Sequence, residues 1–205
     1  MTQLLIATKN PAKEDEFKRL LKGLDLELVT LSDLGIETDV DETEDTFEGN
    51  SKLKAVTYSQ LTNLPAIADD GGVEIYKLNM EPGVTSRRWI DGKTEFSDDE
   101  ILGYTLGRMY GLKGKDRESR LRAVVTFALP NGQVWYEEGI IEGYIADYPG
   151  GVKREGFPFR SVFKIKGIDK YYQNEELTEE EQQKYNHRLI AVRKLSKVIS
   201  EQLDI

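Results

Sequence analysis

One stretch, residues 65–75, constrains the fold of this chain more than any other. It begins as an apolar run at 66–68, continues into two adjacent carboxylates, Asp69 and Asp70, and then reaches two glycines. Because an unpaired charge inside a buried strand is very costly, we expect a strand that carries both acids to its C-terminal end, where the glycines turn the backbone. Ligands of open α/β sheets bind just outside such strand ends. The stretch therefore predicts either a ligand site or an ordinary Asp-Gly turn.

The composition limits the class of protein. The chain has 205 residues, of which 39% are hydrophobic and 32% charged, as in a single globular domain spanning 1–205. The lack of cysteine excludes disulfides and thiolate metal sites. A net charge of −9 argues against a nucleic-acid partner, since duplex binding usually needs a basic face. We see no membrane-spanning apolar run and no signal-peptide pattern, so we expect no membrane partner and a cytoplasmic location.

A strand, a polar turn and a helix open the chain. Residues 4–7 are apolar, Asn10 suits an N-cap and Pro11 suits the first helical position. A helix N-terminus with Lys9 and Lys13 beside it can bind phosphate. An ordinary capped helix with exposed lysines is the alternative, and it is the commoner case.

An acidic segment and a second helix follow. Residues 37–48 contain seven acids and no base, which is typical of a solvated loop. A helix over about 47–61 would place Thr46, Asn50 and Lys54 four residues apart on one polar face. Such a face usually contacts water, although it can also face a cleft.

The second half of the chain adds antiparallel strands. Residues 121–129 and 134–145 are rich in Val, Ile, Tyr and Phe, and Asn131-Gly132 between them is a strong hairpin signal. We also expect a short strand at 162–165, a helical region from Glu175 capped by Thr178, and a last helix after Asn186. Antiparallel strands beside strand–helix units imply a mixed sheet.

Five segments in register resemble the inosine triphosphate pyrophosphatase family. Members of this family hydrolyse non-canonical purine nucleoside triphosphates such as ITP, dITP and XTP to the monophosphate and pyrophosphate. The segments are 7–13, Glu42 with 46–54, 68–74, 82–88 and 187–191. The resemblance implies an α/β fold in which helices flank a mixed twisted sheet, with two lobes around a nucleotide cleft. It also implies a homodimer.

The resemblance implies roles for individual residues as well. Glu42 and Asp70 would ligate Mg²⁺, a hard ion that takes carboxylates, water and phosphates. Asp70 would also orient or deprotonate the attacking water, while Lys13 and Lys54 would hold the triphosphate in the reaction. Further substrate contacts would come from Thr8, Lys9, Asn10, Asn50, Gly71, Phe157, Phe159, Arg160, His187 and Arg188.

The positions that depart from the family pattern include Gly71, Arg160 and Asn186, which stands where the family has the Ser of Ser-His-Arg. Gly71 stands where the family has Ser after the Asp pair, and Arg160 stands where it has Asp in the base-reading loop. Arg160 replaces an acceptor by a fork of hydrogen-bond donors. We therefore hypothesise a base preference that differs from the inosine and xanthosine set. A pyrophosphatase for a pyrimidine or modified nucleotide and a non-catalytic nucleotide-binding protein are the alternatives.

Overall fold

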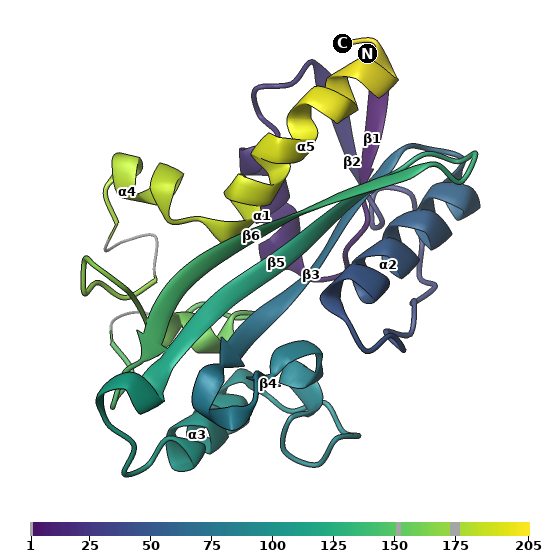
Figure 1. The fold of residues 1–205 in the computed structure, drawn as a ribbon. Coiled ribbons are helices and arrows are strands. Elements are labelled where there is room, and N and C mark those ends of the chain that lie inside the picture. The colour runs from purple at the N-terminus through teal and green to yellow at the C-terminus, as the bar shows by residue number, and fades with distance from the viewer. Residues whose placement is uncertain (1, 151–152, 173–176) are drawn as a thin grey trace. The chain divides into compact units, whose positions relative to one another are not determined.

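A computed structural model describes residues 2–150, 153–172 and 177–205 (Figure 1). Its strands and helices are, in chain order, β1 Thr2–Ile6, α1 Pro11–Leu20, β2 Leu26–Thr30, α2 Phe47–Thr62, β3 Ala66–Ile75, β4 Glu81–Pro82, α3 Asp98–Arg108, β5 Glu118–Ala128, β6 Val134–Ile145, β7 Phe163–Ile165, α4 Glu179–Lys184 and α5 His187–Leu203. The sheet order is β2-β1-β3-β5-β6-β7, and β4 pairs with β3. β1 runs parallel to β2 and β3, whereas β4 and β7 pair in the antiparallel sense. The predicted mixed α/β fold is confirmed.

The chain divides into two compact units. The first contains residues up to 70 together with 123–139 and 188–205, and the second contains 71–122 and 140–187. Strands β3, β5 and β6 each contribute residues to both units. The single domain over 1–205 and the nucleotide cleft between lobes stay predictions.

The first unit has three layers, because successive residues of a strand point to opposite faces of the sheet. α1 and α5 cover one face and α2 covers the other (Figure 1). Leu4 and Ile6 of β1 pack on the α1 and α5 side, and Leu5 packs on the α2 side. The first face buries Phe17, Leu21, Ile67, Val125, Phe127, Val192, Leu195 and Ile199, and the second buries Val29, Ala55, Tyr58, Ala66, Ala68 and Ala128. Polar side chains on β3 therefore meet helix residues on either face.

Several local predictions are confirmed. Asn10 caps α1, and Thr178 caps α4. The Asn131-Gly132 turn closes through a hydrogen bond from Leu129 N to Gln133 O of 2.9 Å, and Gly132 has a φ of +90°. The expected helical start at Glu175 lies outside the described residues.

The structure corrects the prediction for the Asp-Asp-Gly-Gly stretch. β3 does not end at the aspartates, because Asp69, Asp70, Gly71 and Gly72 all continue its extended backbone as far as Ile75. The premise was sound, since an unpaired buried charge would be very costly. The conclusion was wrong because helices of the first unit bring polar partners to both carboxylates.

Helices that could span a membrane are absent from the described ranges. None of the helices there combines the length and the apolar character needed to cross a bilayer.

Candidate active site

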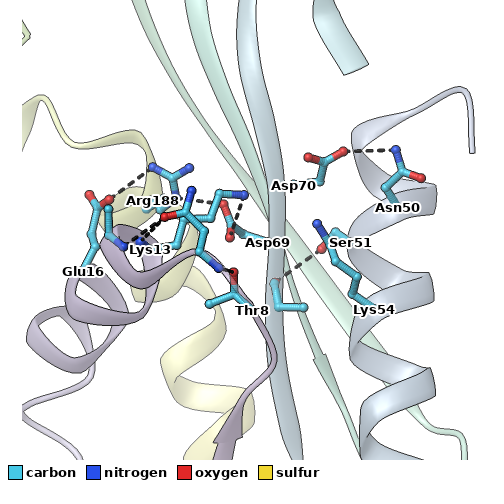
Figure 2. A network of polar contacts seen from close by, with 12 residues as sticks. Thr8, Lys13, Glu16, Asn50, Ser51, Lys54, Asp69, Asp70 and Arg188 are labelled. Atoms are coloured by element: carbon cyan, nitrogen blue, oxygen red, sulfur yellow. Dashed lines mark hydrogen bonds and ion pairs between the residues drawn. The ribbon is translucent and has the colours of Figure 1, made fainter. Parts of the chain in front are cut away.

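β3 presents its two aspartates on opposite faces. Asp69 points toward α1 and α5, whereas Asp70 points toward α2 (Figure 2). Both residues are buried, with relative exposures of 1% and 7%. Each carboxylate therefore has its own set of partners.

Asp69 lies between two cations. Its Oδ1 is 3.2 Å from Lys13 Nζ, and its Oδ2 accepts a hydrogen bond of 2.8 Å from Arg188 Nε. Burial alone would raise the pKa of Asp69, but the charges of Arg188 and Lys13 outweigh it and hold that pKa well below its usual range. Asp69 is therefore ionised throughout the neutral pH range and is too weak a base to take a proton there.

The first turn of α1 positions Lys13. Asn10 Oδ1 accepts hydrogen bonds from the N–H groups of Ala12 (2.9 Å) and Lys13 (3.2 Å). The N–H of Asn10 donates to Thr8 Oγ1 at 3.2 Å, and the N–H of Thr8 donates to Ile6 O at 3.1 Å. These backbone groups, which we expected to bind phosphate, thus already have partners within the loop. The Lys13 side chain is the charged group that this turn adds to the network.

Asp70 faces a different set of groups, on α2 and the acidic segment. Asn50 Nδ2 donates a hydrogen bond of 3.2 Å to Asp70 Oδ2. Burial, with a further contribution from the Glu42 carboxylate, raises the pKa of Asp70 to about 6, although Lys54 opposes the shift. A carboxylate with a pKa near neutrality is suited to accept a proton in catalysis.

Lys54 and Glu42 form an ion pair, with Nζ and Oε1 2.6 Å apart. Burial would lower the pKa of Lys54, but the carboxylates of Asp70 and Glu42 outweigh it and raise that pKa. Burial lowers the pKa of Lys13. An ammonium group therefore lies on each side of β3, half-buried in Lys13 and buried in Lys54.

The acidic segment is fixed to α2 through Glu44. Asn50 Oδ1 accepts from Glu44 N at 2.9 Å, and Asn50 Nδ2 donates to Glu44 O at 3.2 Å. Gly49 permits this close approach, because a Cβ added there would lie 2.6 Å from Glu44 Cβ. Of the polar face predicted for this helix, Asn50 and Lys54 are buried, whereas Thr46 at its start is exposed.

Two more contacts hold the earlier part of the segment. Tyr58 OH donates to Thr38 O at 3.0 Å, and Lys9 Nζ donates to Glu37 O at 2.6 Å. Lys9, predicted to contact substrate, is thus bound to this segment. The result is that Glu42, which lies in neither helix nor strand, is held beside Lys54.

The carboxylates of Glu42 and Asp70 are the candidate metal ligands of this site. Over the described part of the chain, no group of three or more His, Cys, Asp or Glu side chains could hold a metal ion. Mg²⁺ does not need such a cage, because it keeps several waters and binds one or two carboxylates together with substrate phosphates. Glu42 and Asp70, which interact electrostatically, fit that requirement.

The predicted substrate contacts from Gly71 onward belong to the second unit, apart from Arg188. Arg160 Cζ lies 3.6 Å from the centroid of the Phe157 ring and 5.5 Å from that of Tyr172. Tyr172 OH is 3.0 Å from His187 Nδ1. Phe157, Phe159, Arg160, Tyr172 and His187 are all buried, and Gly71 is half-buried. The ring of Phe157, predicted to contact substrate, is thus in contact with Arg160.

Arg188 lies in the first unit. Besides its bond to Asp69, its Nη1 donates to Glu16 Oε2 at 3.2 Å. The sequence reasoning missed Glu16, although its three-residue spacing from Lys13 places both on one side of α1. It also missed Ser51, whose Oγ is 2.6 Å from Thr126 Oγ1.

Comparisons with known proteins identify the family. The model of the Ham1 family matches residues 4–198. The chain belongs to the Ham1 family. This membership confirms the resemblance drawn from the five sequence segments.

Curated Ham1 relatives match over nearly the full length. The chain is 35% identical over 200 residues to the dITP/XTP pyrophosphatase of Bacillus subtilis, covering 97% of the chain and 98% of that protein. It is 38% identical over 193 residues to a dITP/XTP pyrophosphatase of Thermus thermophilus, covering 94% of the chain and 89% of that protein.

Solved structures of Ham1 proteins share the fold. A HAM1 protein from Coxiella burnetii has a TM-score of 0.81 at 29% identity, covering 98% of this chain and 100% of that one. The Ham1 protein of Staphylococcus aureus has a TM-score of 0.79 at 28% identity, with the same coverage.

Proposed function

We propose that this Ham1 chain is a Mg²⁺-dependent nucleoside triphosphate pyrophosphohydrolase that converts non-canonical purine nucleotides such as ITP, dITP and XTP to the monophosphate and pyrophosphate. Family membership makes it a hydrolase acting on acid anhydrides. The observation that carries the proposal is the buried Asp69-Asp70 pair, whose pKa values are shifted in opposite directions between the half-buried Lys13 and the buried Lys54. The curated relatives, named dITP/XTP pyrophosphatases, support the substrate class.

Different residues of the first unit bind the phosphates, bind the metal and accept the proton. Lys13 and Lys54 hold the phosphates, because phosphoryl transfer is mainly a matter of positioning and charge neutralisation. Glu42 and Asp70 would hold Mg²⁺, which supplies further charge neutralisation when bound. Asp70 accepts a proton from the attacking water. The water oxygen bonds to a phosphorus of the α–β anhydride, the bridging bond breaks, and pyrophosphate leaves.

Substrate must rearrange the ion pair between Glu42 and Lys54. At 2.6 Å the two side chains neutralise each other. In the proposed complex Lys54 would bind a phosphate and Glu42 would bind the metal, so that each side chain would keep a partner of opposite charge. The magnesium salt of the nucleotide can make this exchange, because it carries both charges.

The base preference is the part of the proposal that depends on Arg160. A guanidinium presents donors only, which favours a base edge with acceptors. This change at the position of the family's Asp keeps a pyrimidine or modified nucleotide as the alternative substrate. We propose that the ranking of bases departs from the usual preference for ITP and XTP.

We also propose that the enzyme is a homodimer in the cytoplasm, as the family resemblance implies. Sedimentation equilibrium of the purified chain tests the dimer, and a monomer mass at micromolar concentration would refute it.

The first experiment measures pyrophosphate release from ITP, XTP, dITP, dUTP and the four common triphosphates, with and without Mg²⁺. We expect turnover that requires Mg²⁺ and is abolished in Asp70→Asn, while the exposed control Asp25→Asn behaves like the native protein. Ordinary ITP and XTP selectivity would refute the altered base preference. A folded protein that binds a nucleotide without turning any over would establish the non-catalytic alternative.

A further inference from the structure

Glu16 is a buried acid for which the proposed reaction has no use. It lies on α1 one turn after Lys13, and its side chain is only 5% exposed. A buried carboxylate at this position needs a charged partner, because burial of a lone ionised group is very costly. Arg188 is that partner, since its Nη1 lies 3.2 Å from Glu16 Oε2.

The contacts of Glu16 continue to the phosphate-binding lysine. Arg188 bonds to Asp69 Oδ2 through Nε, and Asp69 Oδ1 faces Lys13 Nζ at 3.2 Å. Each oxygen of Asp69 thus faces one cation. Oδ2 accepts a hydrogen bond from Arg188, whereas Oδ1 accepts none from the described residues and contacts Lys13 as an ion pair. Two cations and two carboxylates alternate in the order Glu16, Arg188, Asp69, Lys13 (Figure 2).

We propose that Glu16 is a positioning residue for Lys13, acting through Arg188 and Asp69. This inference rests on the proposed function, in which Lys13 holds a substrate phosphate. Arginine commonly binds a carboxylate with two parallel N–H groups. By binding Nη1, Glu16 fixes the orientation in which the Nε–H of Arg188 reaches one oxygen of Asp69 and leaves the other oxygen facing Lys13.

Loss of the Glu16 charge removes that restraint. Arg188 is then drawn onto both oxygens of Asp69, and Lys13 loses the carboxylate oxygen with which its ammonium group forms an ion pair. A flexible lysine must be ordered again when phosphate binds, which weakens binding. A purely structural Glu16 would affect the stability of the fold and leave the phosphate affinity of the folded protein unchanged.

A double-mutant cycle separates these roles, because residues that act through one another give non-additive effects. The probe is inorganic triphosphate with Mg²⁺, titrated by calorimetry into native protein, Glu16→Gln, Lys13→Met and the double variant. We expect Glu16→Gln to weaken binding about tenfold in the native background, as loss of a charge-assisted contact does. In the Lys13→Met background its effect should be below about twofold.

Glu14→Gln is the matched control, since Glu14 lies on the same helix and pairs at the surface with Lys18. It should bind triphosphate like the native protein. If Glu16→Gln does not fold, Glu16→Asp keeps the charge on a shorter side chain and should give a smaller loss that again vanishes in the Lys13→Met background.

The outcomes distinguish this inference from the function on which it rests. Native affinity in a folded Glu16 variant would overturn the inference, and so would an equal loss in both backgrounds. Native affinity in Lys13→Met would instead remove Lys13 from the phosphate site and refute that part of the proposed function.

Discussion

Asp70→Asn should make the protein more stable at pH 8 while it removes the proposed catalytic base. Burial raises the pKa of Asp70 to about 6 in the folded state, against an ordinary value of about 3.9 in the unfolded chain. The folded state therefore binds the proton more tightly, and this group lowers stability as the pH rises from about 4 to about 6. Above pH 6 the ionised Asp70 carboxylate lowers the folding stability by its full amount. A difference of about two pKa units corresponds to about 3 kcal/mol.

Urea unfolding in the presence of a chelator measures this penalty without bound metal. We expect Asp70→Asn to gain about 3 kcal/mol in the free energy of unfolding at pH 8 and almost nothing at pH 4. Asp69→Asn is the matched control on the same strand. It should lose stability at pH 8, because the native pKa of Asp69 is lowered and its charge is paired with Arg188 and Lys13. Equal stabilities of Asp70→Asn and native protein at pH 8 would refute the reasoning.

Two further substitutions test the acidic segment. Glu42→Gln removes the 2.6 Å ion pair of Lys54. The affinity for metal-free triphosphate should therefore rise several-fold, by about 1 kcal/mol for a partly exposed pair. Calorimetry in a chelator measures this affinity, and weaker binding would contradict the proposal that Lys54 leaves Glu42 to bind a phosphate. Gly49→Ala puts a Cβ 2.6 Å from Glu44 Cβ and should cost about 1–3 kcal/mol together with most of the pyrophosphatase activity. Gly107→Ala, a helical control with nothing within 4 Å of the added Cβ, should be neutral or slightly stabilising in thermal melts.

Local chemistry was enough to predict much of the fold. Asn10 with Pro11 predicted the start of α1, and Asn131 with Gly132 predicted the hairpin turn. Both predictions succeeded because each signal depends on residues within a few positions. The course of β3 could not be predicted in this way. The partners that permit Asp69 in mid-strand include Arg188, which lies 119 positions away.

The candidate site likewise contains residues that the sequence predicted and residues that it could not predict. Lys13, Lys54 and Asp70 were predicted from the family resemblance, and in the first unit Lys54 and Asp70 are buried and Lys13 is half-buried. The sequence could not show that Asn50 and Lys54 on the polar face of α2 are buried, because an Asn and a Lys at helical spacing usually face water. Glu16 was missed for a related reason, since an acid in the first half of a helix is ordinarily a surface residue.

The distance along the chain between Asp69 and Arg188 has a consequence for biosynthesis. At about 5–20 residues per second, the ribosome needs on the order of 6–24 s to add the intervening residues. During that interval a nascent chain already carries Glu16 and Asp69 but lacks the cation that joins them. The face of the sheet covered by α1 and α5 therefore closes only after translation has passed residue 188, and the growing chain must keep two charged carboxylates hydrated until then.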